Sequence, residues 1–560
     1  MGWSSLIFLE TTFCCLDGLS GANFTLTKPR ESMNTMTRHD NCTMLAPLLA
    51  FVIIGLLTES AGAAVVIISN ASTANMSFST STDIWSPTAA HARLNVLDLE
   101  NQLAASDVII ATGSATPSRK ATSIYVDAAL SWTSNHSLNL QALYSILVRA
   151  PIVVAGSGNL VLNVFPSFGN GSISFLGTAN GLTINGRNFI LESSVKDLGS
   201  AIAANPAGNY ALSTNYNAGQ DGTYASSPIA TGFSGIMTGL GNKISNLKIA
   251  STTPNSFVGL FSQISGSVEN LHIQGAFVRG GSGSTVGGLA AVVDGSLSDD
   301  SVSGKIFGQA APVGGLAGVA NGSLSDVSVS GNIFGHGAPV GGLVGVSGVS
   351  YIDYSYSTAS ISGDYQTGGL VGQSNGNISS SFATGAVVTT SGHSAAGGLI
   401  GVANSNSYAF ESYATGALTG TSYSALGGLV GANSGRVGEA YATGSVSGTT
   451  DSEIGGLVGY ESGGSIDDSY AIGAVTGGAG SVSGGVIGYD NGGSMLDMYW
   501  DTTTSGQNQG AGNIPYDPNI TGLTTSQLLS GLPVGFSKGI WEEKTTVNGG
   551  FPYLLTLPPK

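Results

Sequence analysis

The chain has 560 residues, of which 85 are glycine and only 9% are charged, and its formal net charge is −16 at pH 7. Glycine is abundant without the every-third-residue spacing of collagen, and 42% of residues are hydrophobic, so the composition excludes collagen and disorder and favours an all-β chain with many turns. Few lysines and arginines in an acidic chain argue against nucleic acid and anionic membrane surfaces as partners.

The N-terminal region has the pattern of a secretory signal peptide. Residues 44–57 read MLAPLLAFVIIGLL without a charge, and a small-x-small cleavage site ends at Ala63. We therefore expect residues 1–63 to be a leader, with residues 1–32 an extension of the gene model upstream of the true start. An uncleaved anchor is the alternative, although the apolar run is shorter than the ~20 residues of a membrane span.

A first periodic region follows. Residues 64–123 are rich in Ser, Thr and Ala, and we expect them to form an irregular N-terminal cap. Between residues 124 and 185, apolar-x-apolar triplets begin at Leu138, Leu160 and Leu182, at intervals of 22 residues. Such a triplet places two side chains on one face of a strand, so equal spacing stacks these faces if each interval is one coil of a parallel β-helix.

The next segment, residues 186–230, interrupts this period. A capping-box-like sequence at Ser194 predicts the start of a helix laid against the solenoid. At the far end, residues 499–560 are expected to form a C-terminal cap, in which Thr524 and Gln527 form a second capping box.

The strongest pattern lies between residues 231 and 498. A Gly-Gly pair followed by an aliphatic residue recurs every 27 to 30 residues, and each repeat has a second element such as the YATG that begins at Tyr413. One repeat cannot bury its apolar face alone, whereas stacked repeats bury Leu and Val beneath one another at a rise of about 4.8 Å. The sequence therefore predicts an all-β fold, a right-handed parallel β-helix or closely related β-solenoid of tandem Gly-rich repeats with short capping helices.

These motifs carry a family resemblance. GGLVG with YATG at this period resembles the GLUG repeat of bacterial surface proteins, and YWDTTTSG from Tyr499 is similar to the segment that closes such arrays. The LSW, VRAPI and LVLN segments upstream are similar to filamentous-haemagglutinin-like exoproteins. The resemblance covers about residues 124–555 and implies an adhesin-like protein, secreted or at the bacterial cell surface, and often exported through a partner outer-membrane pore. The Asn-Pro-Asn secretion signature of that route is absent after the leader.

Catalytic-looking motifs are better explained by the repeat. The GQSNG of residues 372–376 matches the G-x-S-x-G nucleophile motif, but the same slot in neighbouring repeats reads GANSG and GYESG, which indicates a repeat corner. The His-Glu-x-x-His stretch of GLUG-bearing proteases is absent. No metal-ligand spacing connects the six histidines His39, His91, His136, His272, His336 and His393, and the leader holds all three cysteines, Cys14, Cys15 and Cys42. We therefore predict no catalytic, cofactor-binding or metal residue, no cofactor, and a protein that is not an enzyme.

Two sets of recurring side chains have open interpretations. Carboxylates precede the second strand element in similar slots, and they are Asp299, Asp300, Asp326, Asp353, Asp467, Asp468 and Asp497. This acidic ladder is interpreted as a solvated face that prevents edge aggregation, as a weak Ca²⁺ site, or as a catalytic cluster. One aromatic residue recurs per coil, at Phe382, Tyr413, Tyr441, Tyr470 and Tyr499, either stacked inside the solenoid or as an exposed stripe for sugar rings.

The predicted function is surface display and adhesion through an extended Ser/Thr/Asn-rich face. Expected partners are host or matrix glycans or proteins and an outer-membrane secretion pore, with no nucleic acid and no membrane span in the mature chain. The alternatives are a carbohydrate-active β-helix enzyme, namely a polysaccharide lyase or hydrolase, and a passive spacer or biofilm-matrix component.

Overall fold

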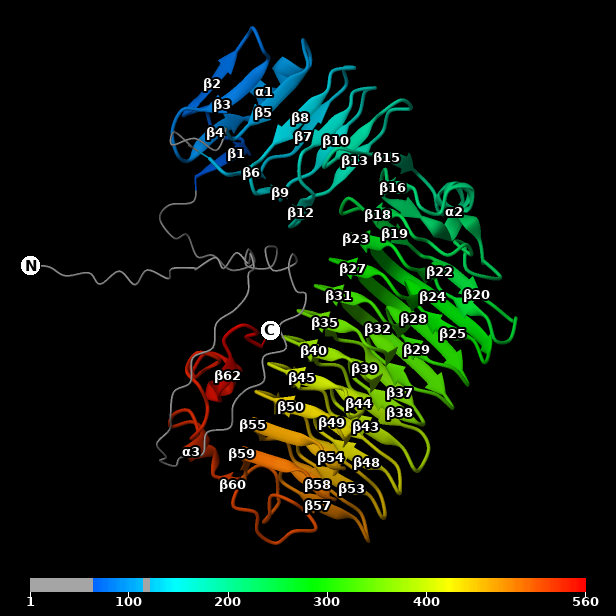
Figure 1. The fold of residues 1–560 in the computed structure, drawn as a ribbon, viewed down its shortest axis with the longest axis vertical. Helices are drawn as coiled ribbons and strands as arrows, with labels where there is room; N and C mark the ends of the chain where they lie inside the picture. Colours follow the sequence, from blue (N-terminus) through cyan, green and yellow to red (C-terminus); the bar gives the residue numbers. More distant parts are fainter. Residues whose placement is uncertain (1–63, 114–120, 560) are drawn as a thin grey trace, which may run out of the picture. The chain divides into compact units, whose positions relative to one another are not determined.

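The computed structural model describes residues 64–113 and 121–559 (Figure 1), so the predicted leader, His39 and the cysteines lie outside the described residues. The described chain is a β-solenoid of about 15 turns with few helices, which confirms the predicted fold class. Within these ranges, no helix is both long enough and apolar enough to cross a membrane.

The 22-residue period corresponds to one coil of the solenoid. Strands β8 (Leu138–Gln141), β11 (Leu160–Leu162) and β14 (Leu182–Ile184) pair in parallel, and the leucine that begins each strand pairs with that of the next. These leucines are buried in one hydrophobic core. Equal spacing in the sequence therefore becomes vertical stacking of like side chains.

The segment before this period is not the irregular cap that its composition predicted. Strand β1 (Val65–Ser69) pairs in parallel with β4 (Ala92–Asn95) and β6 (Ser123–Val126), and β5 (Val108–Ala111) pairs with β8. The physical reason lies in short apolar runs, because alternate side chains of β1 are fully buried in the same core as the later coils. A composition averaged over 60 residues hides strands of four and five.

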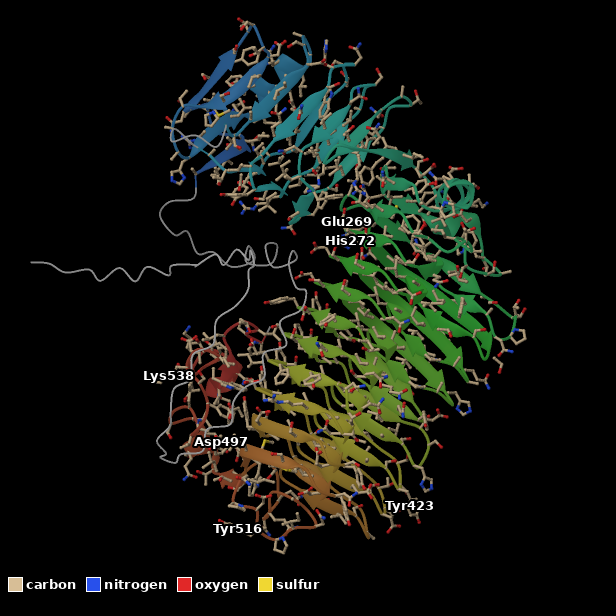
Figure 2. The ribbon with its side chains drawn as sticks, in the orientation of Figure 1. Glu269, His272, Tyr423, Asp497, Tyr516 and Lys538 are labelled. Carbon is tan, nitrogen blue, oxygen red and sulfur yellow. The ribbon has the colours of Figure 1, made fainter. Side chains whose placement is uncertain are left out.

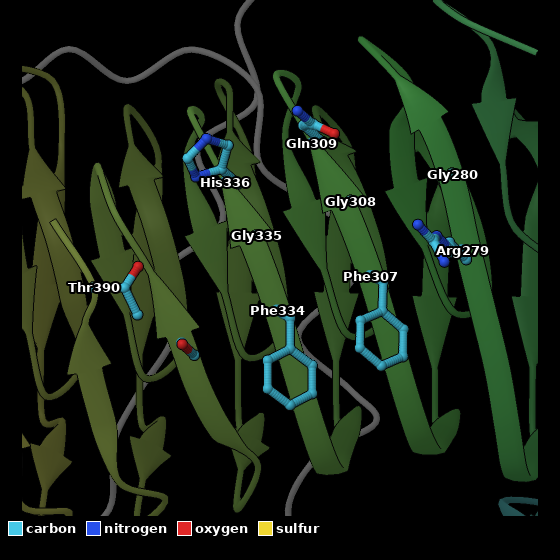
Figure 3. A pocket seen from close by; sticks show the side chains of 10 residues that line it. Arg279, Gly280, Phe307, Gly308, Gln309, Phe334, Gly335, His336 and Thr390 are labelled. Carbon is cyan, nitrogen blue, oxygen red and sulfur yellow. The ribbon is translucent and has the colours of Figure 1, made fainter. Parts of the chain in front are cut away.

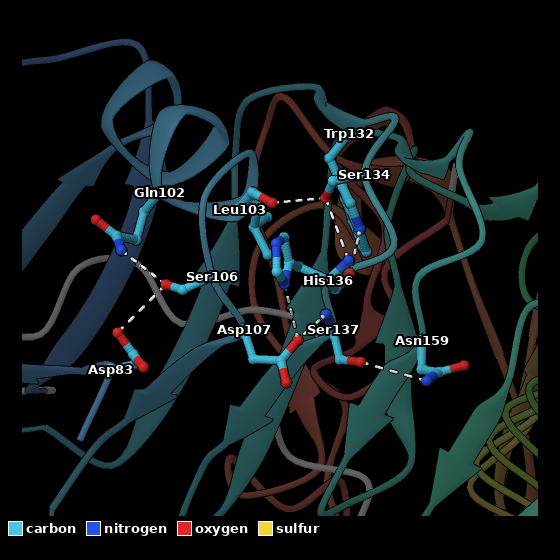
Figure 4. A network of polar contacts seen from close by, with 10 residues as sticks. All are labelled: Asp83, Gln102, Leu103, Ser106, Asp107, Trp132, Ser134, His136, Ser137 and Asn159. Carbon is cyan, nitrogen blue, oxygen red and sulfur yellow. Dashed lines mark hydrogen bonds and ion pairs between the residues drawn. The ribbon is translucent and has the colours of Figure 1, made fainter. Parts of the chain in front are cut away.

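Helix α1 (Val96–Leu103) is fixed to the neighbouring coil by a polar network at its C-terminal end (Figure 4). Gln102 Nε2 donates a hydrogen bond to Ser106 Oγ at 2.8 Å, and Ser134 Oγ donates to Leu103 O at 2.6 Å. A terminal carbonyl that the helix cannot satisfy internally therefore has a partner from the solenoid.

The insert contains the predicted helix but also continues the sheet. Helix α2 (Val195–Ala204) begins after Ser194, whose Oγ accepts a hydrogen bond from Asp197 N at 3.0 Å. Three of its apolar side chains are buried in the core of the second array. Strands β15 (Arg187–Glu192) and β16 (Asn209–Leu212) pair in parallel on either side of this helix, so the two arrays share a continuous ladder of strands.

Each repeat of the second array is one coil that contributes strands to three stacks. One nine-stranded sheet runs from β21 (Phe257–Val258) to β57 (Val482–Gly484), and another runs from β22 (Phe261–Ile264) to β58 (Ile487–Asp490). The remaining strands of each coil pair in a third stack, which we call the long sheet. Figure 1 shows the strands of successive coils side by side.

Glycines of the Gly-Gly pairs are required by close backbone approach. Gly428 lies in a turn between the two nine-stranded sheets, and a Cβ on it would lie 2.1 Å from Gly456 O in the next coil. Its φ is not positive. A left-handed backbone occurs at a different position, which we call the left-handed corner, held in successive coils by Asn270, Asp299, Asp326, Tyr354, Ser380, Glu411, Glu439, Asp468 and Asp497.

Gly428→Ala is expected to lower the free energy of unfolding by about 1–3 kcal/mol, because the added methyl group meets backbone that the neighbouring coils hold in place. Denaturant unfolding followed by circular dichroism measures this change. Gly232→Ala is the matched control, since a Cβ there meets only Gln263 Oε1, at 3.8 Å. Equal stabilities of the two variants would contradict the close-approach explanation.

The recurring aromatic residues are buried, but outside the solenoid core. In each YA dipeptide the alanine belongs to the main core, whereas the aromatic side chain belongs to a second cluster on the other face of the strand. We call this cluster the aromatic ladder, and its rungs are Phe382, Tyr413, Tyr441, Tyr470 and Tyr499. From Phe382 to Tyr470 the neighbouring ring centroids lie 4.8 to 5.3 Å apart. The prediction of a stack inside the solenoid therefore placed the rings on the wrong side of the strand.

The C-terminal segment, residues 524–559, covers the aromatic ladder. It begins with the predicted capping box at helix α3 (Thr525–Leu528) and packs Trp541 among the rings of the ladder. Tyr470 Oη donates a hydrogen bond to Pro552 O at 2.5 Å, and Tyr499 Oη donates to Val534 O at 2.8 Å. These contacts hide from solvent the stripe that would otherwise be available to sugar rings.

Candidate functional site

The serine of the G-x-S-x-G motif points into the solenoid. Ser374 is the last residue of β39 (Val371–Ser374) and is fully buried, where its Oγ accepts a hydrogen bond from Ser407 Oγ at 2.9 Å. Strand pairing places it in a row that we call the inner polar row, which includes Ser347, Ser374, Asn433 and Glu461. The motif is thus one rung of a repeated interior ladder.

Glu461 is the charged member of the inner polar row. It is fully buried, and its carboxylate accepts hydrogen bonds from Asn433 Nδ2 at 2.8 Å and from Gly464 N at 2.6 Å. Burial raises its pKa to about 7, against the lowering effect of these hydrogen bonds. The solenoid interior therefore contains a carboxyl group that titrates near neutral pH.

The histidines are dispersed in the structure as well. His136 contacts Asp107, His336 contacts Asp364, His272 Nδ1 lies 2.9 Å from Ser301 Oγ, and His393 stacks on Tyr423, while His91 has a left-handed backbone. In the part of the chain that the structure describes, no three His, Cys, Asp or Glu side chains are grouped to hold a metal ion.

The predicted acidic ladder divides into three positions around the left-handed corner. Asp299, Asp326, Asp468 and Asp497 occupy the corner itself, Asp353 and Asp467 precede it by one residue, and Asp300 follows it. Burial, reinforced by the charge of Asp326, raises the pKa of Asp299 to about 6. Asp300 is buried and accepts a hydrogen bond from Leu271 N at 2.8 Å. The sequence pattern missed Glu411 and Glu439, which share the corner, because only the backbone conformation aligns them with the aspartates.

One hollow of the long sheet lies on strands β24 (His272–Ser282), β28 (Ser301–Gln309) and β32 (Ser328–His336) (Figure 3), and its volume is about 500 Å³. We call it the Phe334 hollow. Its lining residues come from five successive coils, and they include Arg279, Phe307, Gln309, Phe334, His336, Ser362 and Thr390.

In the Phe334 hollow, one face of the Phe334 ring is stacked on Phe307, and the other face is available for contact with a ligand. Phe307 and Phe334 pair across adjacent coils, and their rings stack at 4.9 Å with an interplanar angle of 6°. The neighbour of Phe307 on one side is Arg279, and the neighbour of Phe334 on the other side is Ser362. Because serine is short, the outer side of the Phe334 ring has no aromatic neighbour in its row.

The same region holds an unusual share of the positive charge. Lys248, Phe277 and Lys305 occupy one row of the long sheet in successive coils, and Lys248 Nζ lies 6.0 Å from the Phe277 ring centroid. With Arg279 in the next row, three cations surround two aromatic side chains in a chain of net charge −16. This surface differs in charge from the acidic corner.

A second hollow, with a volume of about 350 Å³, lies on β35 (Tyr351–Asp353), β40 (Asn377–Ser379) and β45 (Tyr408–Phe410). We call it the Tyr351 slot. In register, the first residues of these strands form one outward row, Tyr351, Asn377 and Tyr408, and the last residues form another, Asp353, Ser379 and Phe410. The slot therefore has two aromatic-bearing coils as walls and one polar coil as floor.

Arg436 supports the Phe410 wall of the slot from behind. It belongs to the following coil, its Cζ lies 5.2 Å from the Phe410 ring centroid, and its Nη2 donates to Asp467 Oδ2 at 2.9 Å. Glu439, beside this ion pair, has a pKa raised to about 7 by burial and by the carboxylates around it. Cation, carboxylates and aromatic rings thus meet at one place on the long sheet.

Comparison with known proteins gives structural neighbours only. No family model matches the chain, and no curated protein matches it. A candidate immunoglobulin A1 protease from Bacteroides ovatus is similar with a TM-score of 0.34 at 14% identity, over 66% of this chain and 92% of that one. A chain named IgA1 Protease is similar with a TM-score of 0.31 at 18% identity, over 52% of this chain and 23% of that one.

These neighbours correct the prediction that the protein is not an enzyme. Both similar chains bear the name of a protease, which contradicts that prediction, and we withdraw it. At these TM-scores the likeness carries no argument about which reaction, if any, this chain performs. The GLUG-repeat and haemagglutinin-like resemblance stays a prediction, since no family model tests it.

Proposed function

We propose that this protein is an exported repeat protein, secreted or displayed at the bacterial surface, which adheres to matrix or cell-surface glycans through its long sheet. One observation supports this function above the others. The Phe334 hollow and the Tyr351 slot both lie on outward rows of the long sheet, and both are lined by exposed aromatic side chains.

Aromatic exposure on these rows is local. Phe334, Tyr351 and Tyr408 are 37%, 49% and 44% exposed. In later coils the row of Phe334 has no aromatic residue and continues as Ser362, Val388, Thr419, Ser447 and Thr476. Large apolar side chains left in water, with polar groups around them, mark interaction sites rather than packing. The solenoid is well suited to this role because stacked coils hold several weak sites at fixed spacing, and binding at several sites raises the overall affinity.

Beads coated with the protein are expected to adhere to polysaccharide-coated or cell-coated surfaces, and the double variant Arg279→Ala/Phe334→Ala is expected to weaken adhesion by about tenfold or more. Tyr516→Ala is the matched control, because it removes an 80% exposed aromatic ring far along the chain from both hollows (Figure 2).

N-terminal sequencing of protein from the culture medium, expected to start at Ala64, tests export. A wild-type protein that adheres to no polysaccharide, cell or matrix surface would overturn the proposal.

One observation favours a second candidate function, cleavage of a polysaccharide chain. Glu439 has a pKa near 7 and lies beside Arg436 and Asp467, which is the combination of a proton donor, a cation and a carboxylate that such chemistry uses. Release of reducing ends from a panel of polysaccharides, lost in Glu439→Gln, would support it. No release from any member of the panel would count against it.

A further inference from the structure

We propose that the Tyr351 slot binds one neutral sugar ring of a glycan chain, inserted between Tyr351 and Tyr408 above Asn377. The inference rests on the proposed function, because it names the ligand class of one site on the adhesive face. It concerns side chains other than the aromatic ladder, which the C-terminal segment covers.

Coil spacing sets the width of the slot. Tyr351 pairs with Asn377 and Asn377 pairs with Tyr408, so the two tyrosines lie two coils apart, at roughly 10 Å from the usual strand spacing. Atoms in contact with each of two side chains need about 3.5–4.0 Å on either side. An occupant one saturated ring thick therefore fits between the tyrosines, whereas two stacked rings do not.

The floor supplies hydrogen bonds of both kinds. The amide of Asn377 offers two donors and an acceptor, and the Asp353 carboxylate accepts a hydrogen bond from Ser379 Oγ beside it. A sugar ring matches this arrangement, because its C–H faces are apolar while its hydroxyl groups project from the edge. Aromatic walls with a polar floor thus suit a ring that is apolar above and below and polar at its rim.

The slot is held open before a ligand arrives. Ile352, Ile378 and Ala409 lie between its two outward rows and are buried in the main core, which fixes the three strands beneath it. Arg436 braces Phe410 from the following coil. A preformed site loses little conformational entropy on binding.

Charge selects against acidic ligands. Asp353 lines the slot and Asp326 contributes a second negative charge near it, while the only cation described beside it, Arg436, is paired with Asp467. A sulfated sugar, a uronic acid or a nucleotide phosphate would meet repulsion here. A neutral hexose-type ring meets none.

Asn377→Tyr is the decisive variant. It fills the gap with the residue type that both neighbouring coils already carry in this row, so the solenoid is expected to fold while the slot closes. Calorimetric titration with neutral glucan, mannan and galactan oligosaccharides is expected to show that wild-type protein binds. Tyr351→Ala is expected to bind with an affinity lower by about tenfold or more, and Asn377→Tyr is expected not to bind.

Ser323→Tyr is the matched control, since it adds a tyrosine to the same row on the far side of Tyr351 and leaves the slot open. It is expected to bind like wild type. Equal affinity of wild type and Asn377→Tyr, or binding only of a sulfated glucan of the same length, would overturn the slot. Wild-type protein that adheres to surfaces but binds none of these oligosaccharides would refute only the slot, whereas wild-type protein that adheres to no surface would refute the proposed function.

Discussion

Trp541→Ala is expected to release the C-terminal segment from the aromatic ladder. The side chain is only 1% exposed, and its ring centroid lies 4.6 Å from that of Phe536, 5.9 Å from Tyr470 and 6.1 Å from Tyr441. Truncating a buried tryptophan costs about 3–5 kcal/mol. Trp541 is the largest of the buried side chains by which the segment packs, the others being Leu528, Phe536, Tyr553 and Leu554, so its loss should open the segment while the coils stay paired.

Limited proteolysis measures this opening directly. Cleavage within residues 524–559 is expected to become much faster in Trp541→Ala, with binding of a hydrophobic dye to the uncovered tyrosines and an unchanged β-sheet signal in circular dichroism. Leu555→Ala, a truncation of an exposed side chain in the same segment, is the control. Unchanged cleavage, or loss of the segment and the solenoid together in one transition, would contradict a separately stable cover.

Regular spacing made most of the architecture predictable. The leucines of the first array and the Gly-Gly pairs of the second array recur at the length of one coil, and strand pairing places each directly beside its counterpart. A period reveals which residues stack even when it does not reveal the shape of the coil. Short strands without a period, such as β1, escaped this reasoning for the same reason.

The side of the strand on which the ladder lies could not be predicted. In the YA dipeptides both side chains are buried, so alternation between buried and exposed residues gives no signal. The aromatic ring is covered by the C-terminal segment, whose contact with Tyr470 joins residues 82 positions apart. Only the folded chain shows that contact.

The two hollows depend on departures from the repeat. Tyr351 and Tyr408 occupy a row that holds Ser296, Ser323 and Ser465 in other coils. A motif search weights positions that recur and passes over those that vary. The available signal was an aromatic residue at a slot that is usually serine, and it becomes readable once the register is known.

The solenoid is expected to gain stability as the pH falls from about 7 to about 4.5, the reverse of ordinary acid denaturation. Burial raises the pKa of Glu461 and of Glu269 from 4.5 to about 7 in the folded chain. Above about pH 7 both carboxyl groups are ionised in the folded chain, and burying these charges lowers the free energy of unfolding. Below about pH 4.5 both groups are protonated in the folded and in the unfolded chain, so this destabilisation disappears. At 1.36 kcal/mol per pKa unit, Glu461 alone contributes up to about 3 kcal/mol.

The pKa values of Asp299 and Glu439 are raised as well, so these two groups also favour the folded chain at lower pH. Protonation also reduces the self-repulsion of a chain of net charge −16. Denaturant unfolding at pH 5 and pH 7.5 measures the combined effect of these groups on the free energy of unfolding. Glu461→Gln removes the charge but offers one acceptor oxygen in place of two, so it keeps the hydrogen bond from either Asn433 or Gly464 and loses the other. It is therefore expected to show a smaller pH dependence than wild type. Asp294→Asn changes an exposed carboxylate and should leave the pH dependence intact. A free energy of unfolding that rises with pH over this range would contradict the prediction, because it would show that the interior carboxylates do not destabilise the folded chain when they ionise.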